Sequence, residues 1–362
     1  VVFERLALAD FGNRLPQLSF EVFRAAGGVE AQVRAVSIIP GSTEFGYDTE
    51  IVTRAEDEGV TVAENAHASA VRSDFSVSLD QLTAGCPGVR AASLVVAWFG
   101  TDLRCGQCAI RPGVVDRVKN TAPETWRVSG TARDTAHLVS RNAGGPAYGG
   151  TPSDASVIRA IQDMKARGLQ VMFHPFVLMD IAAENALPDP YGGAAQAAYP
   201  WRGRLTCSVA PGRAGSPDGT AGCASEIASF LGPAQPSHFV NETLGVRYAG
   251  PAGWGYRRMV LHYARLCALA GGALPFVSAL MSLAAEVKAI LPEARISYGA
   301  DWSEYGAYVP QDGSGDVLFP LDPFWASPHV GFISIDNYMP LADWRDGEGH
   351  LDRLAGHESI YD

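Results

Sequence analysis

The feature that most constrains the fold is a repeated succession of buried strand, loop and amphipathic helix from about residue 90 onward. Residues 93–99 (SLVVAWF) form a continuous apolar run rich in β-branched residues, typical of a strand buried on both faces. Residues 154–167 then carry apolar side chains at helical spacing, with Ser153 placed to cap the helix and Gly168 to end it. Residues 169–179 (LQVMFHPFVLM) predict the next buried strand. This succession predicts an α/β fold with parallel strands covered by helices.

The later part of the chain continues the pattern but contains one irregularity. Two more strands are predicted at residues 296–300 and 330–335. Residues 256–270 favour a helix with one apolar face, and Pro275 suits the first position of another helix. Only residues 271–274 separate these two helices, so no strand intervenes. Either the second helix is an excursion or a strand is missing from the sequence here, and we favour the missing strand.

The N-terminal part has a different pattern. Three short strands separated by turn residues are predicted at residues 18–24, 33–39 and 50–54. We therefore expect a small β-rich unit over residues 1–62. Residues 63–90 are predicted to be a linker that contains a short helix capped by Ser78.

Composition and charge exclude several classes of protein. The 362 residues are 47% hydrophobic and 19% charged, which indicates an ordered chain able to bury a large core. A net charge of −11 opposes a broad nucleic-acid-binding surface. No stretch is long and apolar enough to predict a transmembrane helix. The chain opens without Met and both ends stop within a pattern, so we expect a segment of a longer polypeptide.

The six cysteines are too sparse for a disulfide scaffold. Cys105 and Cys108 form a C-x-x-C, but a structural zinc site needs a second ligand pair and none is evident. We therefore predict no metal site, and no nucleotide or cofactor motif is recognised. Cys207 and Cys223 flank a Gly/Pro-rich loop and could pair in an oxidising compartment, which the sequence leaves open.

Polar residues gather where the predicted strands end, and in parallel β/α folds such positions carry the chemistry. A long Gly/Pro-rich insertion at residues 180–253 would lie at the same face. Carboxylates beside aromatic rings suit a sugar, because rings stack on its C–H groups and carboxylates bind its hydroxyls. The candidate substrate-binding residues are Asp102, His174, Asp301, Trp302, Glu304, Asp336, Asn337 and Tyr338.

Each candidate also has a purely structural interpretation. Asp102 could cap the turn that follows it, and His174 could be a core histidine bonded to backbone. Asp301 could pair with an arginine across the barrel mouth, and Glu304 could be a surface loop residue. Asp336 and Asn337 could form an Asx turn and have no further role.

Several stretches resemble one known family. They are residues 94–104 (LVVAWFGTDLR), 110–114 (IRPGV), 239–251 (FVNETLGVRYAGP), 296–304 (ISYGADWSE) and 335–344 (IDNYMPLADW). They resemble the TIM-barrel, glycoside-hydrolase-like domain of the large baseplate protein of gene transfer agents, which are phage-like particles of alphaproteobacteria. The resemblance runs from about residue 60 to the end. Residues 9–22 (ADFGNRLPQLSFEV) are similar to a motif of siphophage tail-tip and hub proteins.

The resemblance implies a (β/α)₈ TIM barrel over residues 91–362, incomplete here, preceded by the tail-hub-like segment. Strands four, seven and eight of the barrel are not recognised in the sequence. In such barrels the acid/base glutamate ends strand four and the nucleophile glutamate ends strand seven, so neither can be assigned to a residue. A retaining mechanism would need those two carboxylates about 5–5.5 Å apart. The eight residues named above remain as binding positions.

The resemblance also implies a function and partners. The chain would be a baseplate component that binds and cleaves cell-wall glycan, namely peptidoglycan, during DNA delivery. It would associate with other baseplate and tail subunits as a homotrimer, without direct nucleic-acid contact, in a particle assembled in the bacterial cytoplasm that acts at the recipient envelope. The alternative is a structural or glycan-binding module without catalysis.

Overall fold

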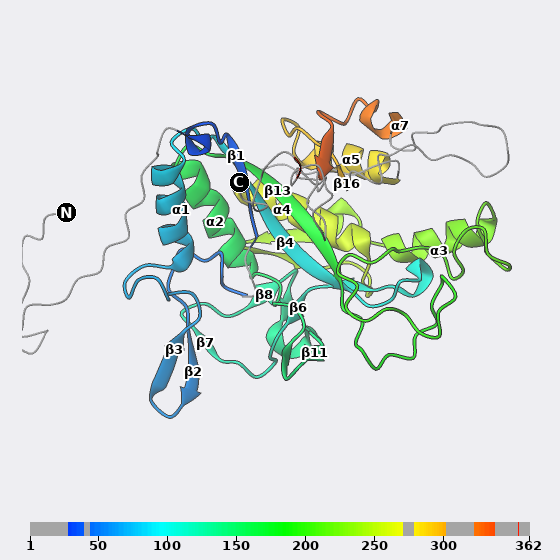
Figure 1. Cartoon of the computed structure of the whole chain (residues 1–362), viewed down its shortest axis with the longest axis horizontal. Helices are drawn as coiled ribbons and strands as arrows, with labels where there is room; N and C mark the ends of the chain where they lie inside the picture. The colour runs from blue at the N-terminus through cyan, green and yellow to red at the C-terminus, as the bar shows by residue number, and fades with distance from the viewer. Residues whose placement is uncertain (1–27, 40–43, 271–278, 302–321, 337–353, 355–362) are drawn as a thin grey trace, which may run out of the picture.

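The computed structural model describes residues 28–39, 44–270, 279–301, 322–336 and 354. At its centre lies a parallel sheet in the order β1 (Ala35–Ile38), β4 (Ala91–Gly100), β13 (Gln170–Met179) (Figure 1). Strand β13 pairs with β4 along its whole length, and Met179 lies opposite Gly100. Both predicted strands are confirmed, and both end at the same edge of the sheet, but β13 is fully covered on one face only.

Strand β1 is a third parallel strand of the central sheet, a position that was not predicted for it. It runs parallel to β4, with Ala35 opposite Ala91. The Tyr47 hydroxyl donates hydrogen bonds to the carbonyl oxygens of Ile38 at 2.8 Å and Val95 at 2.6 Å, which ties the two strands together. The strand predicted at residues 33–39 therefore belongs to the parallel sheet and not to a separate β-rich unit. The strand predicted at 18–24 lies outside the described residues, so the tail-hub-like segment stays a prediction.

An antiparallel sheet of β2 (Thr53–Asp57), β3 (Val60–Ala63) and β7 (Thr121–Ala122) projects from the body of the protein (Figure 1). After it, α1 (Asp74–Gly85) begins at Ser73, whose side chain accepts a hydrogen bond from the backbone N–H of Ser76. The prediction that this helix starts at Ser78 is wrong. Ser73 is buried and satisfies one of the free N–H groups of the first turn, so the helix starts one turn earlier.

Two helices, α2 (Asp154–Ala166) and α4 (Tyr256–Ala270), cover one face of the parallel sheet, and a third, α5 (Ala279–Ile290), packs beside α4. The first two were predicted almost to the residue. Trp98 of β4 is fully buried beneath them, and its indole N–H donates to the Tyr263 hydroxyl of α4 at 2.8 Å. The helix layer and this face of the sheet form the main hydrophobic core.

The other face of the sheet is more open. Side chains alternate along a strand, so Phe99 and Leu178 point away from the helix layer and pack with Val139 in a small second cluster. His174 follows the same alternation and lies opposite Val95 in the register. Met172, on this face too, is 41% exposed. In a closed barrel this would be the interior face.

Two long connections surround the edge where β4 and β13 end. The connection between β4 and α2 contains β5 (Ile110–Arg111), β6 (Gly113–Val114), β8 (Arg127–Val128), β9 (Thr131–Ala132), β10 (His137–Leu138), β11 (Arg141–Asn142) and β12 (Gly145–Pro146). The connection between β13 and α4 contains α3 (Ala221–Leu231), β14 (Phe239–Glu242) and β15 (Gly245–Tyr248). Single 3₁₀ turns lie at Val29–Ala31, Cys105–Gln107, Arg133–Thr135 and Pro236–His238.

Strands β16 (Gly299–Asp301) and β17 (Ser334–Asp336) form a separate parallel pair, and α7 (Asp322–Trp325) lies between them in sequence. Over the described ranges the sheets do not join into a closed barrel. The fold is mixed α/β as predicted. The interruption predicted at residues 271–274 lies outside the described residues.

The N-cap of α2 provides a test of the helix layer. Ser153 is buried, and its side chain accepts the backbone N–H of Ser156 at 3.2 Å. We expect Ser153→Ala to lower the free energy of unfolding by about 1 kcal/mol, measured by urea denaturation. Thr220→Ala, at the cap of α3, should cost less, because α3 buries no residue. Equal effects of the two substitutions would contradict this.

Candidate functional site

The two longest parallel strands bring polar residues to one edge of the sheet. Asp102 lies two residues beyond the end of β4, and Asp180 directly follows β13. The backbone N–H of Asp180 donates to the carbonyl oxygen of Gly100 at 2.9 Å, which extends the strand pairing to the edge itself. We call this edge the rim. It is the end of a parallel sheet at which side chains from the loops converge.

Asp102 is buried at the rim and its carboxylate is fully engaged within the protein. It accepts hydrogen bonds from the Arg104 guanidinium at 3.0 and 2.6 Å and from the Gln196 amide at 2.7 Å. Burial raises its pKa, but the bonds from Arg104 and Gln196 outweigh burial and hold the pKa below the usual range. Asp102 therefore fastens the insertion to the end of β4, which is the structural interpretation that the sequence left open.

His174 lies lower on the same face, in the middle of β13. It is half-buried, and its ring centre is 6.1 Å from that of Phe176. Asp301 and Asp336 end β16 and β17 and lie opposite each other in the register. The structure therefore brings these two backbone positions together, as expected for ends of neighbouring parallel strands. Trp302, Glu304, Asn337 and Tyr338 lie outside the described residues.

Asp180 and His137 form an acid–imidazole pair at the rim that the sequence did not reveal. The His137 Nε2 atom lies 2.6 Å from Asp180 Oδ2, and that oxygen also accepts the backbone N–H of Ser140 at 3.0 Å. The Asp180 side chain is buried, and its Oδ1 atom has no hydrogen-bond partner among the described residues. A buried carboxylate oxygen without a donor has capacity for one more hydrogen bond, and a ligand hydroxyl reaches it once the covering side chains move aside.

Four aromatic residues, Tyr148, Phe176, Tyr199 and Trp201, stand beside this pair, and we call them the aromatic rim. The Tyr148 ring lies 6.3 Å from that of Tyr199 and 6.2 Å from that of Trp201, and Phe176 lies 5.9 Å from Trp201. The Arg202 guanidinium lies over the Phe176 ring at 4.8 Å. Apolar ring faces and hydrogen-bonding groups are thus present in one place.

The backbone at the aromatic rim adopts a conformation that bulky side chains rarely take. Tyr199 and Trp201 have positive φ angles of 44° and 59°. The turn is held because the Met179 N–H donates to the carbonyl oxygen of Trp201 at 2.7 Å. Trp201 remains 56% exposed. Such strain is often stored at binding sites, and here it projects an indole into solvent instead of into the core.

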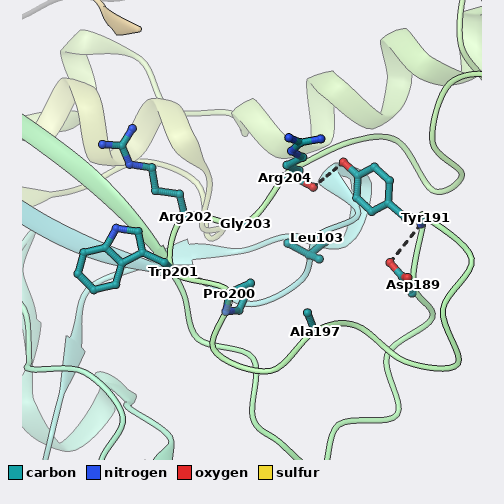
Figure 2. A pocket seen from close by; sticks show the side chains of 9 residues that line it. All are labelled: Leu103, Asp189, Tyr191, Ala197, Pro200, Trp201, Arg202, Gly203 and Arg204. Atoms are coloured by element: carbon teal, nitrogen blue, oxygen red, sulfur yellow. Dashed lines mark hydrogen bonds between the residues drawn. The ribbon is translucent and has the colours of Figure 1, made fainter. Parts of the chain in front are cut away.

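An open pocket of about 780 Å³ adjoins the aromatic rim (Figure 2). Trp201, Arg202 and Arg204 contribute to its lining together with Leu103, which follows β4. The Tyr191 hydroxyl donates to the carbonyl oxygen of Arg204 at 2.9 Å, and this hydrogen bond joins two segments of the insertion that line the pocket (Figure 2). The size fits a small oligosaccharide or a drug-sized ligand.

A cluster of two cysteines and a glutamate lies where the insertion meets the turn after β4. One ligand atom each of Cys105, Cys207 and Glu226 lies within 4.8 Å of the other two. The C-x-x-C of Cys105 and Cys108 did not reveal this cluster, because Cys108 is not part of it. The partners of Cys105 come from residues about a hundred positions away, and only the fold brings them together.

Within the described part of the chain, no helix is long and apolar enough to cross a membrane. Residues 272–362 match the family model of the GTA TIM-barrel-like domain. No curated protein matches the chain significantly. The resemblance noted from about residue 60 onward is thus supported over its C-terminal part. This match supports a gene transfer agent TIM-barrel-like protein.

Proposed function

We propose that this chain is a baseplate component of a gene transfer particle and that it binds cell-wall glycan at the aromatic rim. The observation that carries the proposal is the juxtaposition of exposed Trp201, the neighbouring Tyr148 and the free carboxylate oxygen of Asp180 at the end of two parallel strands. Ring faces stack on the C–H groups of a sugar, and the carboxylate accepts from a hydroxyl.

Tyr148 contributes a ring and a hydroxyl oxygen. Burial raises the pKa of its hydroxyl, so the group stays protonated at neutral pH. The hydroxyl donates to the carbonyl oxygen of Met179 at 3.3 Å, which leaves its oxygen to accept from a sugar hydroxyl. Arg202 adds a positive charge in a chain whose net charge is −11. A cation at the pocket suits peptidoglycan, because its peptide stems carry carboxylates.

Cleavage of the glycan is the finer part of the proposal. Asp102 is engaged by Arg104 and fastens the insertion, and Asp180 is positioned by His137, so we assign neither rim carboxylate to catalysis. The register of β16 and β17 makes Asp301 and Asp336 the first carboxylates to test for chemistry. The association with other baseplate and tail subunits as a homotrimer, and action at the recipient envelope, rest on the family resemblance.

The test is co-sedimentation of the purified chain with insoluble peptidoglycan sacculi. We expect the chain to pellet with sacculi and to be released by soluble peptidoglycan fragments. A chain that stays in the supernatant under all conditions contradicts the proposal. Release of soluble fragments by the wild type, lost in Asp301→Asn or Asp336→Asn, supports cleavage; binding without release leaves a glycan-binding module.

A further inference from the structure

Three potential metal ligands, Cys105, Cys207 and Glu226, converge where the insertion meets the end of β4, and a fourth, Cys223, lies beside Cys207. Cys105 opens the 3₁₀ turn Cys105–Gln107, Cys207 lies in the loop before α3, and Cys223 and Glu226 are three residues apart on α3. The Cys105 Sγ lies 3.9 Å from Glu226 Oε2, and the Sγ atoms of Cys207 and Cys223 lie 2.9 Å apart. Residues three apart on a helix share a face, so Cys223 and Glu226 can reach one ion.

We propose that Cys105, Cys207, Cys223 and Glu226 bind one zinc-class divalent ion. Three thiolates and a carboxylate are ligands that zinc accepts in closed, four-coordinate structural sites, and thiolates select against calcium and magnesium. Sulfur atoms bound to one tetrahedral zinc lie ~3.8 Å apart, given Zn–S bonds of ~2.3 Å. The ligand atoms of Cys105, Cys207 and Glu226 lie within 4.8 Å of one another, and the Cys223 Sγ must move from its 2.9 Å approach to Cys207 to complete the site.

The surroundings of Glu226 fit a metal ligand. Its Oε2 accepts the backbone N–H of Ser208 at 2.6 Å, and its Oε1 accepts the Ser208 hydroxyl at 2.7 Å. Hydrogen bonds of this kind orient carboxylates that bind metals. Cys105 and Cys207 are both buried, so an ion bound there would be shielded from solvent. Each thiol that binds the ion releases a proton to solvent.

The ion would fasten the N-terminal part of α3. This helix buries none of its residues, and Figure 1 shows it at the edge of the protein, away from α1 and α2. Its C-terminal end packs on the core through Phe230 and Leu231, whereas Glu226 faces the turn at Cys105, where a side chain added at Gly106 would meet it at 2.9 Å. A metal at this contact fixes the insertion to the end of β4, and the same insertion carries Trp201.

A disulfide between Cys207 and Cys223 is the competing arrangement. It would use two of the four groups and leave the Cys105 thiol as a hydrogen-bond donor to Glu226 Oε2 at 3.9 Å. Cys105 therefore separates the two ideas. A metal site needs its thiolate, whereas a Cys207–Cys223 disulfide forms without it.

The experiment is metal analysis of the full chain purified with a thiol reductant and loaded with Zn²⁺. We expect one tightly bound equivalent by elemental analysis, and Co²⁺ in its place should give the absorption bands of a tetrahedral thiolate site. Cys105→Ser and Glu226→Gln should each weaken Zn²⁺ binding by tenfold or more. Cys86→Ser, at a half-buried cysteine outside the cluster, is the matched control and should retain full binding.

Far-ultraviolet circular dichroism shows whether each variant remains folded, and a folded Cys105→Ser that binds zinc like the wild type overturns the proposal. Absence of bound metal in the reduced wild type also overturns it. In a second preparation without reductant, an intact mass lower by two hydrogens in both wild type and Cys105→Ser, without metal, assigns the cluster to a disulfide instead. Glycan binding is measured separately, so its failure and the failure of the metal site are distinguishable.

Discussion

Asp154→Ala is expected to lower the free energy of unfolding by about 3–5 kcal/mol, the largest stability loss of any substitution considered. Asp154 is the first residue of α2 and is 2% exposed. Its carboxylate lies 2.9 Å from His262 Nε2 of α4 and accepts the backbone N–H groups of Ser129 and Val246, each at 3.2 Å. Removal leaves three buried donors without an acceptor in the middle of the helix layer.

The loss is measured by urea denaturation, with Asp163→Ala as the matched control on the same helix. Asp163 forms a partly exposed ion pair with Arg167 at 3.0 Å, which is worth at most about 1 kcal/mol. Asp154→Asn keeps one acceptor oxygen, so its loss of unfolding free energy should lie between those of Asp154→Ala and Asp163→Ala. Asp154→Ala and Asp163→Ala with the same unfolding midpoint would mean that the buried cluster does not hold α2, α4 and β15 together.

Trp201→Ala is expected to weaken glycan binding by roughly 10- to 100-fold, because loss of a large apolar contact costs about 1.5–3 kcal/mol. The unfolding midpoint should change little, since the indole is 56% exposed and its backbone carbonyl still accepts from Met179. The change is measured as the affinity for soluble peptidoglycan fragments by isothermal titration calorimetry.

Two further variants make this result specific to the ring. Trp201→Phe keeps an aromatic face and should recover part of the affinity. Val118→Ala removes an apolar side chain that is 88% exposed elsewhere on the surface, and it should bind like the wild type. Equal affinities of Trp201→Ala and Val118→Ala would show that the aromatic rim is not the binding surface.

The sequence predicted well those parts of the fold that depend on local periodicity. The runs at residues 93–99 and 169–179 are mostly apolar because the helix layer covers one face of these strands and loops partly cover the other, and the helix at 256–270 has a single apolar face. The start of α1 was mispredicted because Ser73 and Ser78 are equally good caps by residue type. Only burial of Ser73 and its bond to Ser76 distinguish them.

The candidate site was predicted less well, because it is assembled from loops. The sequence named Asp102 for a position after a strand, and the structure shows its carboxylate engaged by Arg104 and Gln196. Asp180 ends the next strand and pairs with His137, which lies 43 positions away in a connection without a strong pattern. Contacts between residues so far apart in the sequence leave no periodic signal. The aromatic and basic residues at 199–202 (YPWR), within the insertion expected to be functional, are the signal that could have located the binding surface.

The central claim is that glycan binds where β4 and β13 end. Its most direct test is a crystal structure of the chain soaked with a soluble peptidoglycan fragment. The account predicts a sugar ring stacked on Trp201 or Tyr148, with a hydroxyl within hydrogen-bond distance of Asp180 Oδ1. A fragment bound at another surface, with the aromatic rim left in contact with solvent alone, would contradict it.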